Sequence, residues 1–151
     1  MVIKQAIFQV GEEVYGLNIM DVSTVEKPIA KEKATKAPKH VKGMIPLRGE
    51  SLPVYSLRSK FGLEERESSQ ETRLIITNSN GMTIAYEVDR LIGIIDLEPQ
   101  QLYEVPPIAM SKETAYMKQI TNLDGQLVIL LDHDRILSEE ERDALQQMKK
   151  K

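Results

Sequence analysis

The chain has no cysteine, no tryptophan and only two histidines among its 151 residues. Without cysteine, disulfide bonds and thiolate chemistry are excluded. Long hydrophobic runs are also missing, and the longest, Leu127 to Leu131, is far too short to cross a bilayer. The N-terminus, Met1 to Gln5, lacks the basic and apolar regions of a signal peptide. These absences together favour a cytoplasmic protein without membrane insertion.

A large excess of one charge is absent as well. The formal net charge of −3 argues against a nucleic-acid binder, which usually carries a strong basic excess. Charge is nevertheless uneven, because a basic loop between Lys27 and Lys42 contrasts with an acidic stretch from Glu64 to Glu71. The basic loop contains Lys31, Lys33, Lys36, Lys39 and His40. It is interpreted either as a solvated loop, with His40 exposed, or as a surface that steers an acidic partner.

The most informative segment of the chain runs from Val41 to Gly62. Two short apolar runs flank Arg48-Gly49, which predicts a β-hairpin. The first half of this segment reappears at Met117 to Leu131, with its lysine and its turn glycine at the same separation. There the turn is Asp124-Gly125, a strong signal for a type I′ hairpin. The chain therefore contains a repeated strand–turn–strand unit.

The repeat extends further towards the N-terminus, because Ile7 to Val25 matches Leu74 to Ile94. Each half, about 1–68 and 69–137, offers about five short strands, as a small barrel or half-sandwich requires. Each half alone is in the size range where a hydrophobic core is marginal. We therefore expect one domain, 1–151, whose halves meet at the repeated Ile and Val positions. Whether strands exchange between the halves stays open.

The C-terminus differs from the rest. Ser138 to Glu141 forms a capping box, in which the side chains at both ends accept from each other's backbone amides. A narrow apolar stripe follows at Ala144, Leu145 and Met148. This pattern predicts one helix over about residues 139–149 that packs on the β-structure.

No combination of residues in the sequence predicts a catalytic centre. Asp132-His133-Asp134 invites a metal or general-base interpretation, but adjacent strand residues point to opposite faces, so we expect no metal site. No nucleophile turn, Walker motif or dinucleotide fingerprint is present, and no cofactor is expected. Arg48 and Arg58 could each bind a carboxylate, and Arg48 suits the rim of a protein interface. A binding module is the interpretation that remains.

Several motifs, in order and at ordinary spacing, resemble the CheW family of chemotaxis coupling proteins. The resemblance covers nearly the whole chain, from Gln5 to Leu137. The motifs are Tyr15-Gly16-Leu17 with Ile19-Met20-Asp21-Val22, Gly43 to Gly49 with Pro53-Val54, Leu57-Arg58 with Phe61-Gly62, Val88-Asp89, and Leu123 to Asp132 with Ile136-Leu137.

This resemblance implies a fold of two five-stranded SH3-like β-barrels that share a hydrophobic interface, with the helix added at the C-terminus. It implies a non-enzymatic adaptor that couples chemoreceptor cytoplasmic hairpins to the regulatory domain of the histidine kinase CheA, in arrays at the inner face of the membrane. For receptor binding it implies Arg48, Val22, Val25 and Thr24. For kinase binding it implies Gly43, Met44 and Ile45.

The chain keeps the core pattern of the family but departs from it at several surface positions. Residues that differ from the usual type are Thr24, Pro46, Ser56, Gly93, Gln119 and His133. The departures concern partner specificity more than fold, so an auxiliary coupling protein with a divergent partner stays open. Two other classes also stay open: a small peptide-binding barrel module, and a small hydrolase that uses His133.

Overall fold

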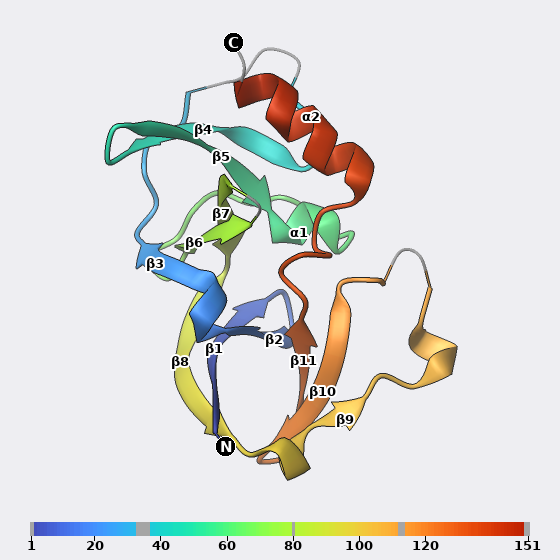
Figure 1. The fold of residues 1–151 in the computed structure, drawn as a ribbon. Helices are drawn as coiled ribbons and strands as arrows, with labels where there is room; N and C mark the ends of the chain where they lie inside the picture. The colour runs from blue at the N-terminus through green and yellow to red at the C-terminus, as the bar shows by residue number, and fades with distance from the viewer. Residues whose placement is uncertain (1, 33–36, 80, 112–113, 150–151) are drawn as a thin grey trace.

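The computed structural model describes residues 2–32, 37–79, 81–111 and 114–149, and consists of two β-sheets and a C-terminal helix (Figure 1). The first sheet has the order β8-β1-β2-β11-β10-β9 and the second the order β3-β6-β7-β5-β4. We call them the six-stranded and the five-stranded sheet. The strands of the first are β1 (Ile3–Val10), β2 (Glu13–Asn18), β8 (Arg90–Leu97), β9 (Tyr103–Glu104), β10 (Met117–Leu123) and β11 (Gln126–Leu131). Those of the second are β3 (Val22–Glu26), β4 (Val41–Leu47), β5 (Glu50–Ser56), β6 (Arg73–Ser79) and β7 (Met82–Val88).

Helical elements are few. The described residues form the α-helices α1 (Leu57–Lys60) and α2 (Glu139–Lys149) and the 3₁₀-helices η1 (Ile19–Asp21), η2 (Pro99–Gln101) and η3 (Pro107–Ala109). The predicted capping box begins α2: the Glu141 amide donates to Ser138 Oγ at 3.1 Å and the Ser138 amide to Glu141 Oε1 at 3.0 Å. The predicted C-terminal helix is thus confirmed.

The repeat in the sequence appears as a repeat in the topology. If β1 and β2 correspond to β6 and β7, β3 to β8, and β4 and β5 to β10 and β11, the order β8-β1-β2-β11-β10 becomes β3-β6-β7-β5-β4. Each sheet therefore combines strands from both halves of the sequence. The halves pair twice in each sheet: in parallel between β2 and β11 and between β7 and β5, and antiparallel between β1 and β8 and between β3 and β6.

Two details of the predicted barrels differ in the structure. The edge strands of each sheet do not pair with one another in the described ranges, so the SH3-like units are open sheets rather than closed barrels. One end of each sheet is covered in another way: Glu32 forms a bridge to Met44 of β4, and β9 pairs with β10. The short strand β9 also gives the first sheet a sixth strand that the sequence did not predict.

The three-residue spacing of Ile19, Val22 and Val25 fitted either a helical turn or a bulged strand. The segment contains both. The 3₁₀-helix η1 ends at Asp21, and β3 follows with an irregularity that leaves Ser23 unpaired against β6. The same irregularity leaves Ile92 of β8 unpaired against β1. The bulge in β3 therefore has a counterpart at the equivalent position of β8.

Alternation along the strands creates three apolar cores. One lies inside the six-stranded sheet, with Ile7, Val14, Leu97, Val128 and Leu130, and one inside the five-stranded sheet, with Ile45, Leu52, Val54, Leu74, Ile76 and Ala85. The largest core is common to both sheets and to α2, through residues such as Phe8, Tyr15, Tyr55, Tyr86 and Leu145. We call it the shared core. Because it needs both sheets, neither sheet can bury its apolar residues alone.

Several of the repeated apolar positions pack against the shared core, but the prediction is wrong for Ile94. Val22, Val25 and Leu91 are partly buried against it. Ile94, the repeat counterpart of Val25, is 58% exposed. The reason is that β8 is an edge strand whose residues alternate, so Ile92 and Ile94 face solvent.

Candidate protein-binding surfaces

Two of the residues expected at a receptor surface meet in one shallow pocket on the five-stranded sheet. Arg48 is exposed at the β4–β5 turn, where its φ of 51° and the φ of 81° at Gly49 match a two-residue hairpin. Thr24 reaches the same pocket from β3. The full lining is Ser23, Thr24, Leu47, Arg48, Glu50, Leu52, Ile76 and Thr83. We call this the Arg48 pocket, and it combines an exposed cation with an apolar floor.

The other two expected receptor residues are directed elsewhere. Val22 and Val25 are half-buried and pack against the shared core. The unpaired Ser23 shifts the alternation of β3, so that Thr24 reaches the Arg48 pocket while Val25 packs inward. The edge strand β3 therefore joins the Arg48 pocket to the shared core.

The three residues expected at a kinase surface lie on the edge strand β4, but they differ in accessibility. Ile45 is fully buried in the core of the five-stranded sheet, and Gly43 is buried as well. Met44 is half-buried, and its main chain pairs with Glu32 at 2.8 and 2.9 Å. Of the three, only Met44 offers a side chain to a partner.

Gly43 has a specific steric role at this edge. Its φ is 156°, and a Cβ built on it would lie 2.7 Å from the Glu32 carbonyl oxygen. A side chain would therefore push the Glu32 segment away from β4. Glycine at this position permits the bridge that covers the strand edge.

The basic loop is not fully solvated, because some of its lysines form ion pairs with carboxylates of the same chain. Lys42 Nζ lies 2.6 Å from Glu87 Oε1, and Lys31 Nζ lies 3.4 Å from Glu87 Oε2. Burial lowers the pKa of Lys42, but the hydrogen bond and charge of Glu87 outweigh it and raise the pKa above its usual value. Lys42 also lies 3.6 Å from Glu65 of the acidic stretch. Lys33 and Lys36 lie outside the described residues.

Arg58 is an internal ion-pair residue rather than a surface cation. Its Nη1 donates to Asp89 Oδ2 at 2.6 Å, and its Nε donates to the Glu64 carbonyl at 2.7 Å. Asp89 also accepts from the Gly11 amide at 2.7 Å. The motifs Leu57-Arg58 and Val88-Asp89 were both visible in the sequence, but nothing in their spacing joined them. Carboxylate binding to a partner is therefore left to Arg48.

The expectation that His40 is exposed is wrong. It is half-buried, with Nδ1 2.6 Å from Ser59 Oγ and its ring edge-on to Tyr55 at 5.7 Å. Burial lowers the pKa of His40. The Tyr55 hydroxyl in turn donates to Glu141, which also pairs with Lys60 at 2.9 Å. This group of residues fastens α2 to the five-stranded sheet.

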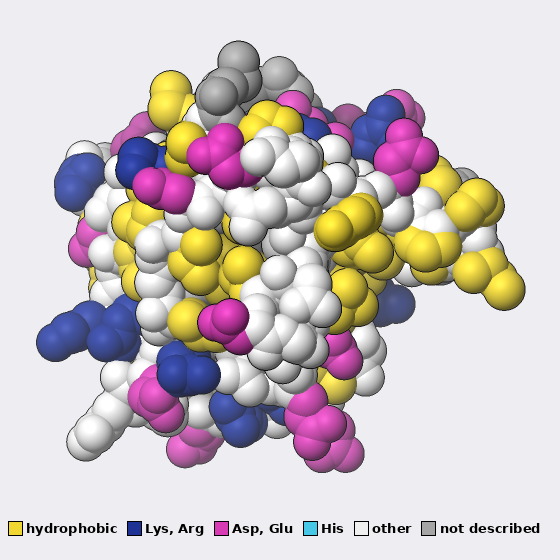
Figure 2. Space-filling model, turned by 90° about the horizontal axis from the view of Figure 1, so that it is seen from below, with side chains coloured by type: hydrophobic (Ala, Val, Ile, Leu, Met, Phe, Trp, Pro, Cys, Tyr) yellow, Lys and Arg dark blue, Asp and Glu magenta, His cyan; other side chains and the backbone are white. Residues whose placement is uncertain are grey.

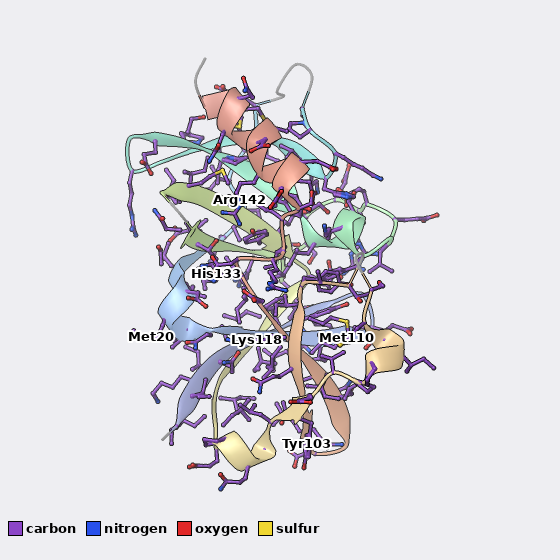
Figure 3. All side chains as sticks on the ribbon, turned by 45° about the vertical axis from the view of Figure 1, so that its right-hand side comes forward. Met20, Tyr103, Met110, Lys118, His133 and Arg142 are labelled. Atoms are coloured by element: carbon purple, nitrogen blue, oxygen red, sulfur yellow. The ribbon has the colours of Figure 1, made fainter. Side chains whose placement is uncertain are left out.

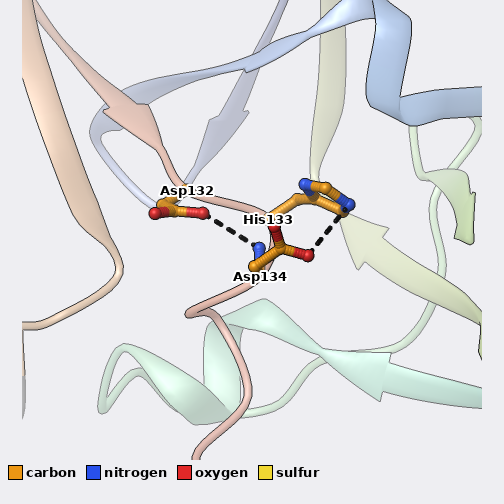
Figure 4. Close-up of side chains that lie close together, drawn as sticks. All are labelled: Asp132, His133 and Asp134. Atoms are coloured by element: carbon orange, nitrogen blue, oxygen red, sulfur yellow. Dashed lines mark hydrogen bonds and ion pairs between the residues drawn. The ribbon is translucent and has the colours of Figure 1, made fainter. Parts of the chain in front are cut away.

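The geometric argument against convergence at Asp132-His133-Asp134 is also wrong. These residues follow β11 in a turn rather than continuing the strand, so opposite faces do not apply. Figure 4 shows the three side chains together, and one ligand atom from each lies within 4.8 Å of the others. His133 is mostly buried, with 14% of its side chain exposed.

Comparison with known proteins identifies the family. The CheW-like domain matches residues 5–141, so the chain belongs to the CheW-like domain family. Chemotaxis protein CheW of Klebsiella aerogenes is 28% identical over 135 residues, which cover 89% of this chain and 81% of that protein. Chemotaxis protein CheW of Helicobacter pylori is 29% identical over 133 residues, covering 88% and 80%.

A solved structure matches over most of its length. The scaffolding protein TtCheW from Thermoanaerobacter tengcongensis superposes with a TM-score of 0.83 at 29% identity, covering 93% of this chain and 91% of that one. These comparisons confirm the resemblance drawn from the motifs, and they support a chemotaxis coupling adaptor. Among the described helices, none is long and apolar enough to span a membrane.

Proposed function

We propose that this chain is a non-enzymatic, cytoplasmic adaptor that couples chemoreceptor cytoplasmic hairpins to the regulatory domain of the histidine kinase CheA, within arrays at the inner membrane face. The observation that supports it most is the Arg48 pocket, which brings Arg48 and Thr24 together on the sheet that also carries β4. An exposed Arg above an apolar floor is typical of a protein-interface contact.

In this proposal the two partners use different parts of the five-stranded sheet. The receptor hairpin occupies the Arg48 pocket, where Arg48 meets a carboxylate of the partner. The kinase domain contacts the edge strand β4, where Met44 supplies the accessible side chain and Ile45 supports the strand from inside. Gly43 acts indirectly, because it sets the position of the Glu32 bridge.

Direct binding of the full chain to the two purified partners tests the proposal. Met44→Glu places a charge on the β4 edge and should weaken kinase binding at least tenfold, while receptor binding stays unchanged. Ile120→Glu is the matched control, because Ile120 holds the same place on β10 opposite β9. Loss of kinase binding by the control alone, or no binding of either partner by the wild-type chain, would refute the assignment.

A further inference from the structure

A polar hollow lies at one end of the six-stranded sheet, where the turn after β11 approaches η1. Asp132, His133 and Asp134 come from the turn, and Asp21 comes from η1. The hollow measures about 250 Å³ and is also lined by Gln5, Asn18, Lys118 and Gln119. None of the proposed partner contacts uses it. Lys118 and His133, both labelled in Figure 3, line this hollow.

The two ring nitrogens of His133 face different carboxylates. Nδ1 lies 3.2 Å from Asp21 Oδ2, and Nε2 lies 3.4 Å from Asp134 Oδ1. A carboxylate on one nitrogen fixes the tautomer and leaves the lone pair of the other nitrogen for a ligand. Two ligands of one tetrahedral ion, with bonds of about 2.1 Å, are about 3.4 Å apart. The separation of Nε2 and Asp134 Oδ1 therefore fits a shared ion.

Gln5 adds a polar side chain to the wall of the same hollow. It is 5% exposed and lines the same hollow. Its polar atoms are not among the enclosed side-chain atoms that lack a partner. Buried polar side chains are nearly always hydrogen-bonded to protein or to ordered water. Water or a hydrated ion in the hollow would complete its hydrogen bonds.

We propose that this cluster binds a divalent transition-metal cation of the zinc type. His133 Nε2, Asp132 and Asp134 are its ligands, and Asp21 is a positioning residue that holds the imidazole. An imidazole among carboxylates suits Zn²⁺ and its neighbours, whereas Mg²⁺ and Ca²⁺ prefer oxygen ligands alone. The bound ion would fasten η1, which directly precedes Val22, to the segment that leads into α2.

Titration of the untagged full chain with ZnCl₂, followed by calorimetry and by NMR of the two histidines, tests this proposal. One ion per chain should bind, and Mn²⁺ should broaden the ring signals of His133 while it leaves those of His40 sharp. His133→Asn should weaken binding at least tenfold, and His40→Asn, the matched control, should not change it. Asp21→Ala should weaken binding about 10- to 100-fold, the usual effect of losing such a carboxylate.

Two further arms sharpen the result. Lys118→Gln removes the cation from the hollow and should tighten Zn²⁺ binding several-fold, because like charges repel. Asp134 is exposed, so Asp134→Asn should keep the fold and decide the matter if His133→Asn does not fold. Affinity that survives both variants, equal broadening of both histidines, or saturation only above about 1 mM would mean an adventitious ion only.

Discussion

The two sheets repeat each other's framework but not each other's surface, and their hairpin turns show this best. Arg48-Gly49 and Asp124-Gly125 occupy equivalent turns, with φ values of 51° and 81° in one and 49° and 87° in the other. The backbone conformation is the same because the hairpin requires positive φ at both positions. The exposed side chain is a cation in one turn and an anion in the other. Strand order is thus constrained by packing, whereas partner recognition can diverge.

The long connections of the two sheets differ in the same way. The β3–β4 connection carries Lys31, which pairs with Glu87, whereas the β8–β10 connection carries the exposed side chains of Tyr103, Ile108 and Met110. Figure 2 shows apolar side chains projecting at its right-hand edge, where this segment lies in Figure 1. Both connections still cover an edge strand. In both sheets the long connection therefore protects an edge strand, but the side chains that it carries differ in chemistry.

Separation of the two halves should have the largest effect. In the fragment Met1 to Ser69, β1 and β2 lack their partners β8 and β11, and β5 lacks β7. We expect no cooperative unfolding and a poorly dispersed NMR spectrum, because each sheet needs strands from both halves. The intact chain is the control. A well-dispersed fragment with a cooperative melt would contradict the exchange of strands.

Substitution of two glycines, one in each sheet, tests how closely neighbouring backbone packs against them. Gly43 and Gly93 have φ values of 156° and 158°, but only Gly43 has backbone atoms close to where a Cβ would lie. Gly43→Ala should lower the free energy of unfolding by about 2–3 kcal/mol, from strain and from displacement of Glu32. Gly93→Ala should cost only about 1 kcal/mol, from strain alone. Urea denaturation measures both values, and equal losses would mean that the Glu32 contact is unimportant.

The helix α2 lies beside β4 and β5, and no described helix covers the six-stranded sheet in the equivalent way (Figure 1). Burial raises the pKa of Glu141, but hydrogen bonds from Ser138, Tyr55 and Lys60 outweigh it and hold the pKa below its usual value. A carboxylate with a lowered pKa stabilises the fold above the unfolded pKa. This contribution is lost as pH falls through the folded pKa, below about 4.3.

Glu141→Gln should therefore lower the free energy of unfolding by about 1–2 kcal/mol near pH 7, because a charge-assisted network is broken. The gap between wild type and variant should narrow below about pH 4, where the wild-type carboxylate is protonated too. Chemical denaturation across this range measures the gap. Glu140→Gln is the control, since Glu140 is exposed on the same helical turn. A gap that is constant with pH would contradict the role of the carboxylate charge.

Much of the fold followed from short-range patterns in the sequence. Hairpin turns, the capping box of α2 and the repeated strands depend on neighbouring residues, and all were predictable. The pairing of β2 with β11 and of β7 with β5 was not, because nothing local distinguishes the sheet that a strand joins. The short strand β9 was missed because two residues carry no periodicity.

The candidate sites were less predictable than the fold, because they depend on contacts between distant segments. Arg58 and Asp89 are 31 residues apart and are brought together by the tertiary fold. His40 was assigned to solvent because its basic neighbours suggested a solvated loop, yet it packs on Tyr55. His133 was assigned to strand geometry, although β11 ends two residues earlier. The environment of His40 depends on burial, and that of His133 depends on where β11 ends. Neither property can be predicted from the adjacent residues alone.

Charge reversal at the two equivalent turns should have the smallest effect on stability and the most specific effect on binding. Arg48→Glu should change the free energy of unfolding by no more than about 0.5 kcal/mol, since Arg48 is exposed. It should nevertheless weaken binding to a receptor cytoplasmic hairpin at least tenfold, because a partner carboxylate then faces a like charge. Asp124→Lys reverses the charge at the matching turn of the other sheet and should leave receptor affinity unchanged. Calorimetric titration of both variants with the same hairpin separates the turns. Equal losses would show that net charge, rather than the Arg48 pocket, governs binding, and unfolding of Arg48→Glu would make Arg48 a structural residue.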